Sequence, residues 1–386
     1  MTVSFDLRNI FENLVMLFVV VGTFFYVPAS NMTPEQAIEF GYMTQELFMR
    51  YGIFFIFAFS LCLKPLRACN LKWLAALFIY CIFLSVLNGF DIQMRRSMLN
   101  LFSGFLFVKI VSDHFQSSSL KKIGYWLLAI LILNCAFSAQ QYFKVDPLFT
   151  TDPNLGPKDS IAGLFKNKVH LGVFISIISP FIFNIFPPLA LVPVPLLCAS
   201  NSSTAIVSFL ISIGFLIYFR VRKLFFLIFI AVLAVSASFY VWKYDAPGGQ
   251  FGERFKIWNA VYSIALTTHP YVGNGIGSFA RLNLQSTQKT TDQKLEWVWV
   301  HNEYLQAFFE FGAMGLAIIF FYVKDCFAVF IKHYQDNNLK VIFSSLVAVF
   351  ILSFFHFPFH IARLAIPSLF VMGLFHARLK DLENAC

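Results

Sequence analysis

Charged residues are scarce in this sequence: Lys, Arg, Asp and Glu make up 13% of 386 residues, whereas 58% are hydrophobic. A soluble globular domain has about 25% charged residues, so that class is excluded. The sequence also lacks a Walker motif, a Gly-x-Ser-x-Gly elbow, a His-Glu-x-x-His helix and an Asp-x-Asp pair. These absences argue against a P-loop, an α/β-hydrolase triad, a zinc protease and a divalent cation held against a nucleotide diphosphate. A metal-independent reaction is therefore expected.

Cysteine pairs with metal-ligand spacing are absent as well. The seven cysteines contain no Cys-x-x-Cys and fall in apolar segments or on the expected inner side, so we predict neither a zinc site nor a disulfide framework. No internal repeat and no low-complexity tract occur. The net charge of +9 would suggest nucleic acid in a soluble protein, but membrane topology accounts for many of these cations. We expect no nucleic-acid partner and no cofactor.

Long apolar runs are what the sequence does have. A helix needs roughly 20 mostly apolar residues to cross a membrane, and about twelve segments qualify, some of them marginally. They span residues 10–28, 48–64, 71–88, 96–112, 123–143, 169–186, 188–199, 203–219, 224–242, 303–323, 339–357 and 361–378. The seventh is short and rich in proline, which predicts a broken or re-entrant helix. The expected fold class is an all-α polytopic membrane protein, with residues 1–386 as one integral membrane domain.

Basic residues in short loops predict the orientation, because Lys and Arg accumulate in cytoplasmic loops. With the N-terminus inside, every strongly basic short loop falls on the inner side, provided that the proline-rich segment counts as a crossing. This favours twelve spans with both termini in the cytoplasm. Cleavage of the first span as a signal peptide is not expected, since its loss would reverse the orientation of all later spans.

Two polar segments, residues 144–168 and 243–302, face outward in this topology. Long loops on one face of a helical bundle are where binding and catalysis concentrate, so the chemistry should be extracytoplasmic. Residues 254–267 have apolar side chains near helical spacing, which predicts an amphipathic helix at the membrane interface. The glycine-rich run 273–277 predicts a tight turn, because no strand or βαβ pattern supports a nucleotide-binding loop.

Several cations lie on the expected outer side, against the topological trend. They are Arg95, Arg96, Lys158, Lys166, Lys168, Arg254, Lys256 and Arg281. Guanidinium groups form paired hydrogen bonds with phosphate oxygens, so this set could bind a phosphate-bearing substrate. Contact with lipid headgroups or solvent is the alternative. A site role is favoured for Arg254, which lies beside Trp258 at the start of the expected amphipathic helix.

His301 stands where the 243–302 loop enters an apolar helix. A neutral imidazole can accept a proton from a hydroxyl, and a hydrogen-bonded structural histidine is the alternative. Glu303 and Glu253 are other candidate bases, whereas Glu310 is expected to be a paired structural carboxylate within the helix. At about 100° per residue, one packed stripe is expected to contain His301, Leu305, Phe308, Gly312 and, beside them, Gly315.

His301-Asn302, Gly312 and Gly315 fit a signature of His, then Asn, Ser or Gln, nine residues, Gly, two residues, and Gly, Thr or Tyr. In this the chain resembles the ligase branch of the O-antigen ligase and polymerase superfamily of bacterial envelope glycan enzymes. Further stretches that look similar are residues 163–172, 254–258 and 270–279. With about twelve spans and a long outer loop before the tenth, the resemblance covers most of the chain.

The resemblance implies a GT-C-like glycosyltransferase of the bacterial inner membrane. Such an enzyme moves a glycan from undecaprenyl pyrophosphate to an acceptor on the periplasmic face, without metal and with inversion of the anomeric centre. For ligases the acceptor is the lipid A core oligosaccharide, and membrane lipids surround the protein. By the same resemblance, His301 is the candidate base and Arg254 a pyrophosphate ligand. Asn302, Gly312, Gly315 and Trp258 have structural roles.

One departure concerns the run Ser202-Ser203-Thr204, where many members of the superfamily have Ser-Arg ahead of the eighth span. A phosphate contact is therefore in question, and Arg95, Arg96 or Lys168 are candidates to supply it. Lys166 and Arg281 are further candidate contacts to the pyrophosphate or glycan.

Four activities remain open at this point. A ligase is favoured by length, because protein O-oligosaccharyltransferases of the superfamily usually carry a longer C-terminal region. A polymerase, which extends the glycan on the same carrier, has nearly the same architecture. A polysaccharide transporter is less favoured, because transporters tend to place polar residues and paired broken helices at mid-membrane, whereas here the polar residues lie on the outer face.

Overall fold

A computed structural model describes residues 6–25, 34–63, 71–89, 92–115, 120–143, 162–165, 167–200, 202–220, 250–281 and 300–384. At residues 34–41, 93, 190–191, 220, 250–253 and 281 only the backbone is described. These ranges consist of helices, turns and connecting loops, and no strand occurs within them. The all-α class expected from the sequence is therefore supported for this part of the chain.

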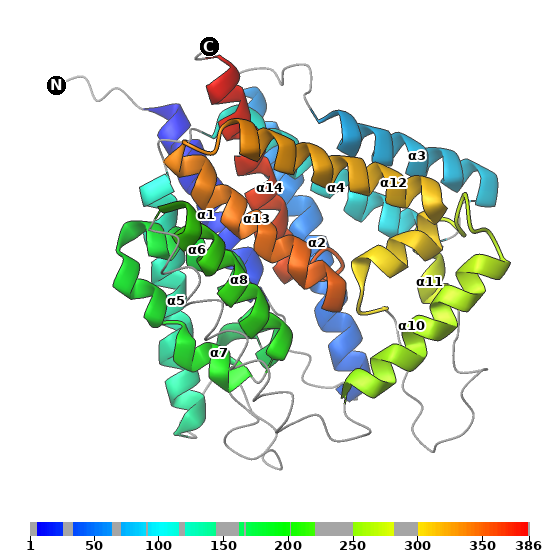
Figure 1. Cartoon of the computed structure of the whole chain (residues 1–386), viewed down its shortest axis with the longest axis horizontal. Helices are drawn as coiled ribbons and strands as arrows, with labels where there is room; N and C mark the ends of the chain where they lie inside the picture. Colours follow the sequence, from blue (N-terminus) through cyan, green and yellow to red (C-terminus); the bar gives the residue numbers. More distant parts are fainter. Residues whose placement is uncertain are drawn as a thin grey trace.

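The helices follow the apolar runs of the sequence. Their bounds are α1 (Leu7–Phe24), α2 (Pro34–Leu61), α3 (Lys72–Asn88), α4 (Ile92–His114), α5 (Leu120–Tyr142), α6 (Lys168–Ile185), α7 (Val194–Ser200), α8 (Ser203–Arg220), α10 (Gln250–Thr267), α11 (Ser278–Arg281), α12 (Glu303–Lys332), α13 (Asn337–Phe355) and α14 (Ala362–Glu383), with 3-10 turns η2 (Gly163–Phe165) and η3 (Pro187–Leu191). Every expected span within the described residues overlaps a helix (Figure 1), and the expected span 224–242 lies outside them. The proline-rich span is broken into η3 and α7, as its prolines predict.

Six of the described helices are long and apolar enough to cross a membrane: α1, α5, α6, α12, α13 and α14. Three further apolar segments are shorter, namely α3, α8 and the stretch from η3 to α7. By length and composition the protein is a multi-pass membrane protein. The count of twelve spans stays a prediction.

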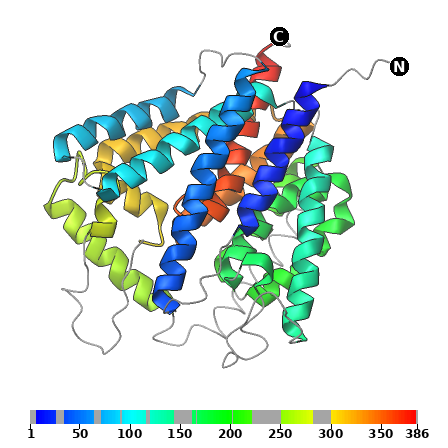
Figure 2. The ribbon, with the colours of Figure 1, turned by 180° about the vertical axis from the view of Figure 1, so that it is seen from behind.

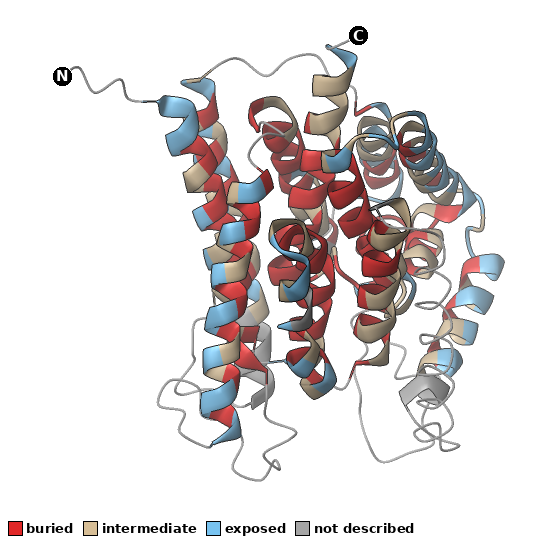
Figure 3. Ribbon diagram, turned by 60° about the vertical axis from the view of Figure 1, so that its left-hand side comes forward, coloured by how far each residue is buried: buried red, intermediate tan, exposed pale blue. Residues whose placement is uncertain are grey.

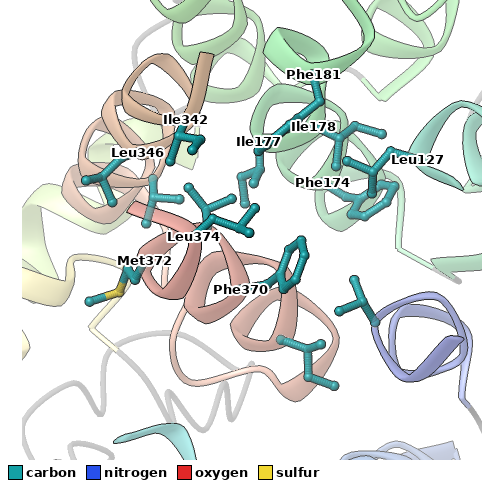
Figure 4. Close-up of a cluster of buried hydrophobic side chains, with 14 of the residues drawn as sticks. Leu127, Phe174, Ile177, Ile178, Phe181, Ile342, Leu346, Phe370, Met372 and Leu374 are labelled. Atoms are coloured by element: carbon teal, nitrogen blue, oxygen red, sulfur yellow. The ribbon is translucent and has the colours of Figure 1, made fainter. Parts of the chain in front are cut away.

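α6, α13 and α14 form the centre of the bundle. In their most apolar windows 72%, 72% and 78% of the residues are buried, compared with 22% in α12. Figure 3 shows buried residues concentrated on these central helices. In Figure 4, Phe174 and Ile177 of α6, Ile342 of α13, and Phe370 and Leu374 of α14 belong to one cluster of buried side chains. Because lipid is as apolar as these side chains, close packing holds the helices together.

α10 lies at the edge of the bundle and packs against α12. Ile257, Val261 and Ala265 recur every four residues along α10 and are buried with Phe309 of α12, whereas Tyr262 is 52% exposed. One face of α10 is therefore apolar and covered, as the pattern over 254–267 predicts.

α12 is broken at Gly312, whose φ of 65° and ψ of −169° lie outside the helical region (Figure 1). Loop 270–277 docks at this break: the N–H groups of Ala313 and Met314 donate to the carbonyls of Pro270 and Tyr271 at 2.8 and 3.1 Å. A Cβ on Gly312 would lie 2.4 Å from the Tyr271 carbonyl oxygen, so only glycine fits. The continuous stripe expected from His301 to Gly315 is therefore wrong, because the helix bends at Gly312 and His301 precedes it.

The helices begin and end at two opposite ends of the bundle. α1 begins and α14 ends at the same end, whereas the end of α5 and the start of α10 lie toward the opposite end (Figures 1 and 2). Helices α2, α6, α10, α12 and α14 contribute to the polar site described next.

Candidate active site

His301 has a φ of 58°, the positive value that non-glycine residues rarely adopt, and among the described residues it is the only non-glycine one with this property. Hydrogen bonds fix the chain on both sides. The Trp258 indole N–H donates to the Val300 carbonyl at 2.9 Å, and the Val300 N–H donates to Gln306 Oε1 at 3.3 Å. Asn302 caps α12 by accepting the Leu305 N–H at 2.9 Å. Such strain costs about 1–3 kcal/mol and persists where neighbours enforce it, often at functional sites.

Three histidines gather around Phe357. The ring centres of His301 and His356 lie 4.5 and 4.6 Å from that of Phe357, and His170 lies 5.6 Å from His356. Burial, with the positive charge of Arg254, lowers the pKa of His301 to about 3. Burial also lowers the pKa of His356 to about 3, with smaller contributions from His301 and Arg254. Both imidazoles are therefore neutral at ordinary pH and can accept a hydrogen bond or a proton.

Arg254 reaches across from α10 to the end of α13, where its Nη1 donates to the Phe355 carbonyl at 3.1 Å. Burial lowers the pKa of this guanidinium, although its ordinary value of 12.5 is high enough to keep it charged. The pKa contributions to His301 and His356 place its charge beside both rings. A cation and two neutral imidazoles thus share one partly buried site.

A hydrogen-bonded chain joins the start of α12 to the loop before α14. Glu303 Oε2 lies 2.8 Å from His360 Nδ1, and Glu303 Oε1 accepts the Phe359 N–H at 2.9 Å. Gln306 Nε2 lies 2.9 Å from His360 Nε2 and donates to Glu310 Oε1 at 3.1 Å. Burial opposes a charge on His360, but the Glu303 carboxylate, together with the charges of Glu310 and Glu46, outweighs burial and raises the pKa of His360 to about 9. Glu303 is therefore already paired.

Arg363 lies at the start of α14 and is 4% exposed. Its Nε donates to Gln45 Oε1 of α2 at 3.2 Å, and its Nη1 donates to the Phe165 carbonyl of η2. It lies close enough to His170 to interact electrostatically. A buried guanidinium is expensive in a membrane and marks a functional position by default.

Residues 188–320 match the O-antigen ligase family. This confirms the likeness that the His301 motif indicates, because the matched stretch contains Arg254, Trp258, His301, Gly312 and Gly315. A comparison with curated proteins gives no match. The O-antigen ligase match supports glycosyl transfer of the ligase or polymerase type, acting on lipid-linked glycans.

The cations singled out in the sequence take different positions relative to the His301 motif. Arg254 lies with His301. Arg96 forms a fork with Glu46 at 2.7 and 2.9 Å, and the Glu46 charge contributes to the raised pKa of His360, so this pair borders the site. Arg95 is exposed, and Lys168 is the first residue of α6, two residues before His170. Lys166 and the side chain of Arg281 lie outside the described residues.

Four residues that lie near the His301 motif in the structure were not singled out from the sequence: His170, His356, His360 and Arg363. The signal for three of them was available where the last two expected spans meet, in a stretch that reads His356-Phe-Pro-Phe-His360-Ile-Ala-Arg363. Two histidines and an arginine in one short stretch at an outward turn are unusual in a chain this apolar. His170 had no such signal, because it lies within an apolar span.

Metal ligation is not apparent in the part of the chain that the structure describes, where no three His, Cys, Asp or Glu side chains are arranged to hold an ion. Glu310, which is 3% exposed, accepts the Gly277 N–H at 3.0 Å and the Gln306 amide. It is engaged in the α12 break, as expected for a structural carboxylate.

Proposed function

We propose that the protein transfers a glycan from undecaprenyl pyrophosphate to an acceptor hydroxyl on the periplasmic face of the bacterial inner membrane. The favoured reaction is ligation of O-antigen to the lipid A core. The observation that carries this proposal is the neutral His301 imidazole, held in a strained backbone beside the Arg254 guanidinium within the O-antigen ligase match.

In this reaction the acceptor hydroxyl attacks the anomeric carbon from the side opposite the pyrophosphate. The bond between that carbon and the pyrophosphate oxygen breaks, and the anomeric centre inverts. His301 takes the hydroxyl proton, and Arg254 stabilises the charge that develops on the leaving pyrophosphate. Because the sequence has no Asp-x-Asp pair, we assign charge neutralisation to guanidinium and ammonium groups rather than to a metal.

The basicity of His301 depends on the donor. With a pKa of about 3 the imidazole is a weak base. A pyrophosphate beside Arg254 places negative charge next to the ring, and a nearby opposite charge raises the pKa of an imidazole. Donor binding therefore makes His301 a stronger base, which couples proton acceptance to the presence of the leaving group.

The remaining cations and the topology complete the proposal. We assign Arg95, Lys166, Lys168 and Arg281 to contacts with the pyrophosphate or glycan, and Arg96 acts through its pair with Glu46. Residues 144–168 and 243–302 are periplasmic loops, and both termini are cytoplasmic after twelve spans in a GT-C-like arrangement.

Deletion of the gene tests the proposal, with lipopolysaccharide resolved by gel. Loss of a ligase leaves bare core while glycan polymer accumulates on the lipid carrier. Loss of a polymerase leaves core that bears a single repeat. Unchanged lipopolysaccharide contradicts both readings and directs the search to exopolysaccharide or glycoprotein, where a protein O-oligosaccharyltransferase or a transporter would act.

The role of His301 is tested in the same strain with His301→Ala. We expect transfer to be lost while the amount of protein in the membrane is unchanged. The exposed His269, just after α10, supplies the control His269→Ala, which should transfer normally. Near-normal transfer by His301→Ala would remove this residue from the role of base.

A further inference from the structure

An apolar groove lies between α1 and α2, which pack side by side (Figure 2). Its volume is about 690 Å³, it is open along one side, and its lining includes Leu14, Leu17, Val21, Phe48, Tyr51 and Phe55. This volume falls within the roughly 300–1,000 Å³ of small-molecule sites. We call it the α1–α2 groove.

The groove is elongated along the two helices. Its α2 lining extends from Thr44 to Ile56, a rise of about 18 Å along the helix axis. That is more than half of the roughly 30 Å hydrocarbon core of a bilayer. The floor is set by Gly52, where a Cβ would lie 2.2 Å from the Phe18 ring, so α1 approaches α2 directly there. Such a shape fits one extended apolar chain.

One end of the groove meets the candidate active site. Thr44 lines that end, and the next residue, Gln45, accepts a hydrogen bond from Arg363 at 3.2 Å. On the other wall, Phe25 lines the groove, and the preceding Phe24 contacts the Phe165 ring at 6.2 Å. The Phe165 carbonyl accepts the other hydrogen bond of Arg363. Residues next to both walls of the groove therefore lead to the buried guanidinium of Arg363, through Gln45 on one side and Phe165 on the other.

From Arg363, a series of neighbouring side chains leads to His301. Arg363 interacts electrostatically with His170, whose ring lies 5.6 Å from that of His356, and His356 shares Phe357 with His301. Because Arg363 is 4% exposed, water and salt screen its charge little. An anionic group at the mouth of the groove would be attracted by this charge.

We propose that the α1–α2 groove binds the polyprenyl chain of the donor next to its pyrophosphate, with the pyrophosphate at the Arg363 end and the glycan toward His301. This inference rests on the proposed function. A polyprenyl diphosphate is favoured over a bilayer phospholipid because the groove ends at a buried cation that leads to the reacting centre.

The test fills the groove and compares two donors. Val21 is 37% exposed and Leu17 is 48% exposed, so Val21→Trp and Leu17→Trp add volume to the groove without disturbing the core. Ile132→Trp on α5, at a position 55% exposed on another candidate span, is the control. Each purified protein, in nanodiscs, receives the same glycan on undecaprenyl diphosphate or on a short prenyl diphosphate.

We expect the groove variants to lower kcat/KM for the undecaprenyl donor about tenfold through KM, with little change for the short donor. Ile132→Trp should match the unmodified protein with both donors. Equal losses of kcat/KM for both donors, or equal kcat/KM values for Val21→Trp and Ile132→Trp, would overturn the assignment of the polyprenyl chain to the groove. Absence of transfer by the unmodified protein from either donor would instead count against the proposed function.

A binding measurement keeps the inference testable without turnover. A polyprenyl diphosphate carrying a diazirine on its first isoprene units should label α1 and α2 on irradiation, and Val21→Trp should suppress the label. Labelling that an excess of bilayer phospholipid removes, or labelling confined to other helices, would contradict the assignment.

Discussion

His301 and Arg254 form the pair on which the proposed chemistry depends, because the charge of Arg254 adds to burial in lowering the basicity of His301. Burial and the Arg254 guanidinium hold the pKa of His301 at about 3. Replacing Arg254 by Gln removes the charge and leaves the burial, so the pKa of His301 should rise toward its ordinary value of about 6.5. Histidine titration by NMR of labelled protein measures this shift.

The same Arg254→Gln variant should lose transfer, although its histidine is a better base. The loss follows because the pyrophosphate no longer meets a guanidinium, and one lost charge-stabilising group costs about 10²–10³ in rate at comparable sites. Lys256→Gln, at an exposed position on α10, is the control and should change neither the titration nor transfer. An unchanged pKa of His301 in Arg254→Gln would show that the charge of Arg254 does not influence this imidazole.

The Glu303–His360 pair makes a pH-dependent contribution to stability. The pKa of His360 is about 9 in the folded protein, above the ordinary value of 6.5. A raised pKa means that the folded state binds the proton more tightly, so the contribution is complete below about pH 6.5 and is lost as pH rises toward 9. Thermal unfolding in detergent should show a larger fall in Tm from pH 6.5 to pH 10 for the unmodified protein than for His360→Gln.

Glu303→Gln keeps an oxygen for the Phe359 N–H but removes the charge that raises the pKa of His360. It should reproduce the flattened pH response of His360→Gln. His269→Gln, at an exposed position just after α10, should retain the full pH response. Identical pH responses in all four proteins would show that the pair contributes nothing to stability.

At the level of single elements, the break in α12 is what brings loop 270–277 against the helix. Gly312 and Gly89 both have positive φ with extended ψ, a region open almost only to glycine, at 65° and −169° and at 77° and 153°. A Cβ on Gly312 meets the Tyr271 carbonyl at 2.4 Å, whereas a Cβ on Gly89 meets nothing within 4 Å. Gly89→Ala therefore measures backbone strain alone, and Gly312→Ala adds a steric clash with main-chain atoms.

We expect Gly89→Ala to lower the free energy of unfolding by about 1–3 kcal/mol and Gly312→Ala by more. Gly312→Ala should also reduce transfer, because the break positions the first turns of α12, where Glu303 and Gln306 hold the residues around His301. Denaturation followed by intrinsic fluorescence and a transfer assay on the surviving fraction measure both effects. Equal destabilisation by the two substitutions would mean that the clash relaxes.

The sequence predicts the positions of helices well, because the length of an apolar run decides whether a helix can cross the membrane. It does not predict the break at Gly312, because helical periodicity assumes a straight helix and the bonds that replace the lost ones come from Pro270 and Tyr271. His301 and Arg254 were recognisable from local patterns. Their neighbours His356 and Arg363 stand in a short stretch that a local pattern could also have marked, but only the packing of separate helices shows that they lie beside the His301 site.

For the whole molecule, the placement of the two ends predicts the topology. The start of α1 and the end of α14 lie at one end of the bundle (Figures 1 and 2), which predicts an even number of crossings. Because the proposed topology places both termini in the cytoplasm, a fluorescent protein fused after Cys386 should fluoresce there, and so should one fused before Met1. Alkaline phosphatase inserted within residues 282–299 should be active, because it folds only in the oxidising periplasm. Fusions at the two termini that report opposite sides would contradict the even number of crossings. An inactive phosphatase in this loop with normal protein levels would place His301 on the side of the membrane that lacks the glycan acceptor.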